Sequence, residues 1–83
     1  MPADEYRREA AQAAAALGHR AAREQPPGLE FTLRELAEAT WPDLSPVEQR
    51  QAGRKFRAML AQAPIGPLDE WKTSDNEWHY RRR

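Results

Sequence analysis

Residues 32–48, which read TLRELAEATWPDLSPVE, hold two helix-start signals a few residues apart. Thr32 with Glu35, and Ser45 with Glu48, both match the capping box. In that motif a hydroxyl accepts a hydrogen bond from the backbone three residues on, and the acid returns one. Two such signals in so short a stretch predict two helices joined by a tight turn.

Three prolines set the bounds of these helices. Pro42 cannot continue a helix, so the first is predicted over about residues 33–41. Pro46 stands at the first position of the second helix, where its missing N–H is no loss, and Pro64 ends that helix near residue 63. The four residues between the helices form the turn of a helix-turn-helix.

The segment before this unit is rich in alanine. Residues 3–24 contain nine alanines and no proline, which predicts a helix. All but two members of its candidate buried stripe are small: Tyr6, Ala10, Ala13, Ala14, Leu17 and Ala21. Small side chains permit close packing on the rest of the chain, and the alternative is a homodimer through residues 3–24.

The segment after the helices changes its pattern. Aromatic and polar side chains alternate near the end, and the turn-forming run 73–76 separates two arms, about residues 68–72 and 77–82. This pattern predicts a β-hairpin. An isolated hairpin is marginal in water, so it needs a further strand, for which residues 29–31 have room.

The predicted order of elements is helix, short strand, helix, turn, helix and hairpin. This is the order of the winged helix-turn-helix, in which the third helix reads the groove of the nucleic acid and the hairpin loop is the wing. We therefore predict a single α+β domain over residues 1–83, a small winged helix-turn-helix-like domain with three helices, a short strand and a C-terminal β-hairpin. Residues 29–83 would supply the helix-turn-helix and the wing.

The composition excludes several classes of protein. The chain has 83 residues and no cysteine, which rules out disulfides, thiolate chemistry and cysteine-bound zinc. No apolar run approaches the roughly 20 residues that cross a bilayer, and the first residues are acidic, unlike those of a signal peptide. We expect a soluble, cytoplasmic protein with no membrane partner.

Charge is balanced in total but not along the chain. Thirteen basic residues match thirteen acidic ones, yet residues 1–49 carry a net charge of −4 and residues 50–83 one of +4. In the third helix, Arg50, Arg54 and Arg57 fall on one line opposite the apolar stripe, and no acid follows the helix start. This ridge favours nucleic acid or an acidic partner. The alternative is a solvated face, which usually carries glutamates to pair with the arginines.

The hairpin and the end of the chain add further polar groups. Its tip can donate hydrogen bonds to phosphate oxygens, although Asp75 and Glu77 would repel phosphate. The last three residues are predicted to form a flexible basic tail. The predicted contact residues are Arg50, Gln51, Arg54, Lys55, Arg57, Lys72, Thr73, Asn76, Arg81, Arg82 and Arg83.

Side chains suited to catalysis are scarce. His19 and His79 have no acids at metal-ligand spacing, and the four glycines lie too far apart to cradle a phosphate. Gly53, inside the third helix, is best explained by the close approach of a neighbouring element. We therefore expect no enzyme, no bound metal and no cofactor.

Three motifs follow one another along the chain: F-x-L-x-x-L at residues 31–36, G-R-x-F at residues 53–56 and N-x-x-x-Y at residues 76–80. With these motifs, the chain resembles a family of small uncharacterised proteins from bacteria and their phages over about residues 29–82. The resemblance implies a winged-helix-like domain and assigns no activity. The alanine-rich helix lies outside it.

Three functions remain open at this point, of which one, a purely structural dimerisation domain, rests on the alanine-rich helix alone. The first is nucleic-acid binding, most simply of DNA by a regulatory protein, through electrostatic docking of the third helix and the wing. The second is a protein-interaction module, such as a phage- or prophage-encoded inhibitor or adaptor, that applies the same ridge to an acidic protein surface. The isoelectric point near 6.7 is lower than is usual for a DNA-binding domain. The choice between DNA and RNA also stays open.

Overall fold

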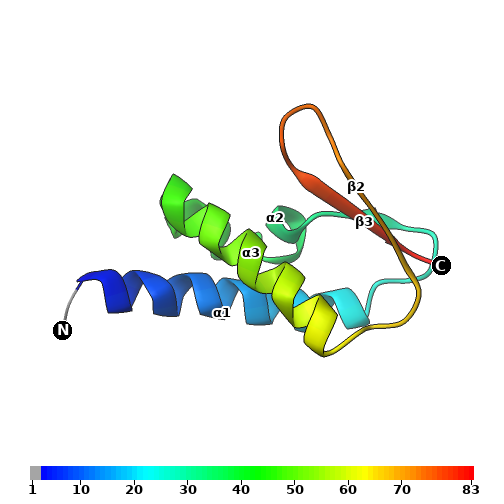
Figure 1. Cartoon of the computed structure of the whole chain (residues 1–83), viewed down its shortest axis with the longest axis horizontal. Helices are drawn as coiled ribbons and strands as arrows, with labels where there is room; N and C mark the ends of the chain where they lie inside the picture. Colours follow the sequence, from blue (N-terminus) through cyan, green and yellow to red (C-terminus); the bar gives the residue numbers. More distant parts are fainter. Residues whose placement is uncertain (1–2) are drawn as a thin grey trace.

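The computed structural model describes residues 3–83, with side chains from Glu9 onward. Within these residues it contains three α-helices and a three-stranded antiparallel sheet, a small α+β structure (Figure 1). The elements are α1 (Ala3–Arg23), β1 (Glu30–Phe31), α2 (Leu33–Leu36), the 3-10 turn η1 (Trp41–Asp43), α3 (Pro46–Gln62), β2 (Leu68–Lys72) and β3 (Trp78–Arg82). Their order agrees with the prediction, and one of them, the second helix, is much shorter than predicted.

The helix predicted over residues 33–41 ends at Leu36. Thr40 explains the early end, because its N–H (3.0 Å) and its hydroxyl (3.2 Å) both donate to the carbonyl of Ala37. Pro42 also disfavours helical backbone at the residue before it. The chain therefore passes through a turn and then η1 before α3 begins.

Both helix-start signals lie where the sequence predicts them. Ser45 Oγ accepts from the Glu48 N–H at 3.2 Å, and the Glu48 carboxylate accepts from the Ser45 N–H at 2.7 Å, which completes the capping box of α3. Thr32 Oγ1 accepts from the Glu35 N–H at 3.2 Å, but the Glu35 carboxylate accepts from the Thr32 hydroxyl instead of the backbone. The start of α3 is the more firmly fixed of the two.

The core lies where α1, α3 and the sheet meet. Phe31, Phe56 and Tyr80 come from β1, α3 and β3 and are almost fully buried. The Tyr80 ring lies nearly parallel to Phe31 at a centroid distance of 5.7 Å and edge-on to Phe56 at 5.3 Å. Burial raises the pKa of the Tyr80 hydroxyl, although the nearby Arg57 opposes this effect. These three rings join the sheet to the helices.

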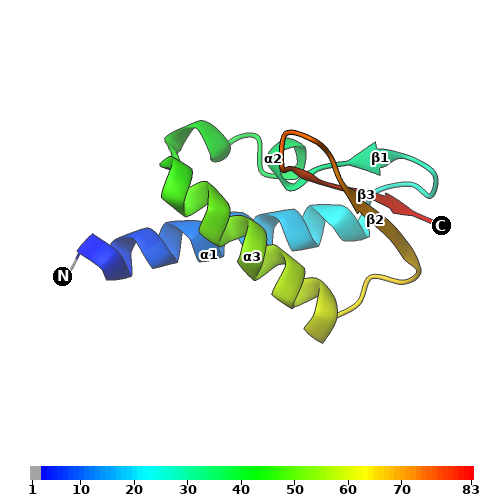
Figure 2. The ribbon, with the colours of Figure 1, turned by 45° about the horizontal axis from the view of Figure 1, so that its top comes forward.

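The buried face of α1, as far as its side chains are described, contains only alanine and glycine, and it packs across α3 (Figure 2). It consists of Ala11, Ala14, Ala15, Gly18 and Ala22. The predicted stripe is wrong in register: Ala14 is buried, its other described members are half-buried or exposed, and Tyr6 lies outside the described side chains. The helix is rotated because Gly18 is turned inward, where a Cβ would overlap Leu33 Cδ1 and lie 3.6 Å from Phe56 Cδ1.

Gly18, and not Gly53, is therefore the glycine at a close approach. A Cβ built at Gly53 would have no atom of a neighbouring element within 4 Å, so the close approach predicted there is wrong. Gly18 instead brings the backbone of α1 against side chains of α2 and α3. This packing within one chain accounts for the small residues on the buried face of α1.

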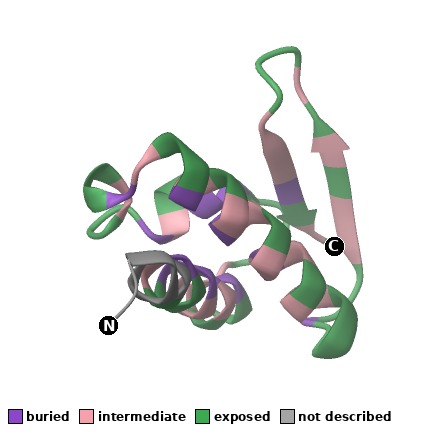
Figure 3. Ribbon diagram, turned by 60° about the vertical axis from the view of Figure 1, so that its left-hand side comes forward, coloured by how far each residue is buried: buried purple, intermediate pink, exposed green. Residues whose placement is uncertain are grey.

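The sheet has the order β1-β3-β2, so the last strand is the central one. Tyr80 pairs with Phe31 on one side and with Glu70 on the other. Because side chains alternate along a strand, Trp71 and His79 lie on the face away from Tyr80 and the helices, where their rings stack at 5.9 Å. β2 and β3 extend past the helices as a hairpin with an exposed tip (Figure 3).

Candidate nucleic-acid interface

A groove of about 520 Å³ lies between the exposed side of α3, the α2 region and the tip of the hairpin. Arg50, Gly53 and Arg54 line it from α3, and Lys72 and Asn76 line it from the hairpin. Gly53 has no side chain, which leaves the floor of the groove open. The structure thus gathers predicted contact residues from both predicted elements around one space.

The groove has a net positive charge. Its lining contains five cations and two carboxylates. Three of those cations, Arg50, Arg54 and Lys72, are exposed and have no carboxylate oxygen within 4 Å among the described residues. A cation without an acidic partner gives up no ion pair when it neutralises a phosphate. These three side chains are the strongest anion-binding candidates in the groove.

Arg57 has a different position from the one predicted. Its guanidinium pairs with Glu70 at 3.1 Å and lies 3.7 Å from the centroid of the Trp78 ring. Burial by itself would lower the pKa of Arg57, but the neighbouring Tyr80 hydroxyl and Glu70 carboxylate outweigh that effect and raise it. Arg57 therefore joins α3 to the hairpin and forms a wall of the groove instead of projecting from a ridge.

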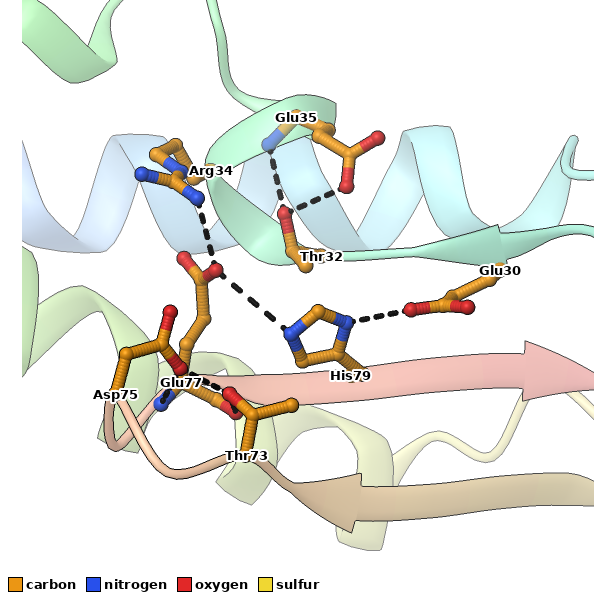
Figure 4. Close-up of polar contacts among 8 residues, drawn as sticks. All are labelled: Glu30, Thr32, Arg34, Glu35, Thr73, Asp75, Glu77 and His79. Carbon is orange, nitrogen blue, oxygen red and sulfur yellow. Dashed lines mark hydrogen bonds and ion pairs between the residues drawn. The ribbon is translucent and has the colours of Figure 1, made fainter.

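The hairpin tip is held by its own polar groups. The Thr73 N–H donates to the Glu77 carbonyl at 3.0 Å, and the Thr73 hydroxyl donates to the Asp75 carboxylate (Figure 4). This hydroxyl hydrogen bond holds the pKa of Asp75 below its ordinary value. Asn76 has a φ of 68°, the left-handed conformation that asparagine tolerates in turns. Thr73 thus builds the turn, whereas Asn76 lines the groove.

Glu77 opposes an anion less than the sequence suggests. Its carboxylate accepts from Arg34 Nη2 at 2.9 Å and lies 3.9 Å from His79 Nε2, while His79 Nδ1 lies 2.7 Å from Glu30 Oε1 (Figure 4). This row of contacts joins α2, the hairpin and β1. Because Arg34 balances Glu77, the three unpaired cations face one remaining carboxylate of the lining, Asp75, and the groove keeps a net positive charge.

Two predicted contact residues that flank the ridge lie away from the groove. The helical periodicity of α3 places Gln51 and Lys55 on the flank opposite Arg57. Neither lines the groove. Gln51 Oε1 is buried without a hydrogen-bond partner among the described residues.

The prediction of a flexible basic tail is wrong, because Arg81 and Arg82 belong to β3. Arg82 Nη1 donates to the carbonyls of Arg23 and Gln25, both at 2.9 Å, and so satisfies acceptors at the end of α1. Arg81 and Arg83 extend from the opposite face of the strand, where both pair with Asp69, at 3.6 and 2.7 Å.

The groove lining also includes residues outside the predicted contact set, among them Arg34, Trp41 and Trp78. Arg34 reaches the hairpin only through the fold, and no local pattern marks it. Trp78 did carry a signal, because it alternates with Tyr80 in a predicted strand and therefore shares its helix-facing side.

In the described part of the chain, no cluster of three histidine, aspartate or glutamate side chains could hold a metal ion. The helices there also lack the combination of length and apolar character that crossing a bilayer requires. No family model, curated protein or solved structure matches the chain. Function must therefore be inferred from the site itself.

Proposed function

We propose that this protein is a winged-helix-like module that binds nucleic acid, with duplex DNA as its first candidate, in the groove between α3 and the hairpin. One observation carries the proposal. Arg50, Arg54 and Lys72, which lie on two separate elements, converge on one groove without acidic partners. A concentration of unpaired cations beside a protruding hairpin suits the phosphate backbone of a duplex.

The arrangement of elements supports the winged-helix part of the proposal. A short strand precedes α2, α3 follows a turn, and a terminal hairpin extends beside α3. The contact of Tyr80 with Phe56 places the hairpin next to α3. α3 would be the groove-reading helix and the tip near Asn76 the wing.

The side chains divide into two roles in this proposal. Arg50 lies in the first half of α3, the part that contacts base edges in helix-turn-helix proteins, and arginine can donate two hydrogen bonds to guanine. Arg54 and Lys72 would contact phosphates on either side of the groove, and Asn76 would donate a further hydrogen bond from the tip. Catalysis is not part of this proposal.

Fluorescence anisotropy with labelled duplex DNA, single-stranded DNA and RNA over a range of salt concentrations tests the proposal. Arg54 and Lys72, the two cations that would contact phosphates, predict a slope of log affinity against log salt of about −1.8 on duplex DNA. In the variant Arg50→Ala/Arg54→Ala that slope should move toward zero by about 0.9, for the loss of the Arg54 contact.

The matched control is Arg20→Ala/Arg23→Ala, which removes two exposed arginines from α1 and changes the net charge equally. It should leave the slope unchanged. Equal losses in the two variants would mean that net charge alone drives binding, and the groove would lose its role. Binding only to RNA or to single strands would move the proposal to that nucleic acid.

The neutral total charge favours one other candidate, a protein-interaction module that applies the same cations to an acidic protein surface, as an inhibitor or adaptor would. It predicts no binding to any nucleic acid at low salt. It also predicts that the unaltered protein retains an acidic partner protein and that the variant Arg50→Ala/Arg54→Ala does not.

A further inference from the structure

We propose that the free edge of β2 binds an extended peptide segment of a partner protein as an added antiparallel strand, with an aliphatic side chain seated in a hollow between β2 and α3. The sheet order leaves β2 paired on one side only. This surface extends toward the base of the hairpin and shares Lys72 with the groove of the proposed nucleic-acid interface.

The strand register shows which backbone groups lie at the free edge. The Arg83 N–H donates to the Pro67 carbonyl at 3.2 Å, and the Thr73 N–H donates to the Glu77 carbonyl at 3.0 Å. Hydrogen-bonded pairs alternate with non-hydrogen-bonded ones in an antiparallel ladder. Residues 69 and 71 therefore turn their backbone groups to β3, and residues 68, 70 and 72 turn theirs to the free edge.

A hollow of about 350 Å³ adjoins this edge. Its apolar lining comes from Leu60 of α3, Ile65 of the connection and Leu68 of β2, and the Arg57–Glu70 ion pair closes one end. β3 contributes no residue to the lining, so the hollow lies toward the outer side of β2. A strand added there would direct every second side chain toward α3.

The charged side chains along the free edge of β2 determine which peptide sequence fits it. Lys72 has no acidic partner among the described residues, and Leu68 lies at the hollow. Glu70, between them on the same edge, pairs with Arg57 and can accept a second cation with its exposed carboxylate. In an antiparallel strand, an acidic residue opposite Lys72 precedes an aliphatic residue opposite Leu68 by four positions. A basic residue midway would lie opposite Glu70. The partner segment therefore carries an acidic residue, a basic residue two positions later and an aliphatic residue two positions after that.

The probe is the blocked peptide acetyl-Thr-Glu-Thr-Lys-Thr-Leu-Thr-amide, with a scrambled peptide of equal composition as control. In titrations of the ¹⁵N-labelled protein, the amide signals of Leu68, Glu70 and Lys72 should shift most. Their hydrogen exchange should slow, whereas Asp69 and Trp71 are protected by β3 beforehand. Equal shifts with the scrambled peptide, or shifts confined to the groove at the hairpin tip, would overturn the proposal.

A backbone variant sharpens this test. Glu70→Pro removes the central N–H of the free edge and keeps the ladder to β3, because proline is tolerated where its missing N–H faces solvent. It should weaken peptide binding by at least about fivefold, the loss of one net hydrogen bond. Glu70→Ala retains the N–H and should bind more tightly than Glu70→Pro.

Equal affinity of the two variants would show that the edge N–H is not used. The exchange measurement on the unaltered protein decides the question if Glu70→Pro fails to fold. The peptide edge and the proposed DNA groove share Lys72, but the arginine variants alter neither Lys72 nor β2. Loss of DNA binding in those variants would therefore leave peptide binding in place, and the two proposals can fail separately.

Discussion

The two sides of α3 differ in what their side chains contact. Toward α1 the helix presents Ala52 and Phe56, both fully buried against a face of alanine and glycine. Toward the hairpin it presents Arg50, Gly53 and Arg54 to an open groove. The side toward α1 is closely packed, whereas the side toward the hairpin leaves an open groove lined by cations without acidic partners. Stability and the proposed binding are thus separated on a single helix.

The largest expected effect concerns the closed side of α3, the side that packs against α1. Phe56→Ala removes a ring that contacts Tyr80 and lies against Gly18. We expect it to lower the free energy of unfolding by about 3–5 kcal/mol, the usual cost of emptying an aromatic core position. Urea denaturation followed by circular dichroism measures this. A loss below about 1 kcal/mol would show that the closed side does not hold the fold together.

The second prediction adds a side chain to the same closely packed interface, at Gly18 of α1. Gly18→Val would force its side chain against Leu33, so we expect a loss of about 1–3 kcal/mol. Thermal and urea unfolding check it, with Gly53→Val as the comparison at an open position. If the valine costs as much at residue 53 as at residue 18, helix propensity and not close packing explains the effect.

A third prediction extends the comparison to the end of α1. Arg82→Met keeps the aliphatic stem but removes the donors to the carbonyls of Arg23 and Gln25. We expect a loss of about 1–2 kcal/mol, because hydrogen bonds from a charged donor are lost. Arg83→Met, which breaks only an exposed pair with Asp69, should change stability by less than about 0.5 kcal/mol.

The open side gives a smaller effect of opposite sign. Gly53→Ala adds a methyl group that meets no neighbouring element, and alanine is the better helix former. The free energy of unfolding should rise by about 0.5–1 kcal/mol. Destabilisation would indicate that the hairpin closes onto α3 in solution and that the groove is not open.

The smallest effect is a pH dependence. The Arg83 hydrogen bond, with a further contribution from Arg81, holds the pKa of Asp69 below its ordinary value. The unfolded chain therefore takes up this proton more readily, and stability falls as the pH falls through the folded-state pKa. Asp69→Asn should flatten the acid limb of a plot of stability against pH. An unchanged limb would assign it to other carboxylates.

The sequence predicted the elements that local chemistry determines and missed those that tertiary contacts decide. The capping box of Ser45 and Glu48 located the start of α3, and the turn residues located the hairpin. The register of α1 could not be predicted, because Gly18 is turned inward only by the presence of Leu33 and Phe56.

The candidate site shows the same limit. Arg50 and Arg54 followed from helical spacing, since they lie four residues apart on one helix. The pairing of Arg57 with Glu70 and of Arg34 with Glu77 depends on where the hairpin crosses the helices. Residue spacing along a sequence shows which cations share a face, and only the fold shows which carboxylates neutralise them.

The central place of β3 has a kinetic consequence. β2 meets β3 across a short turn, whereas β1 meets it only when Glu30 closes a long loop to Arg81. Loop closure costs entropy before the contacts it allows are gained, so the two pairings should form in sequence, the hairpin first. We expect mutations in the hairpin turn to slow folding and mutations at β1 chiefly to speed unfolding, which places β1 late on the folding path.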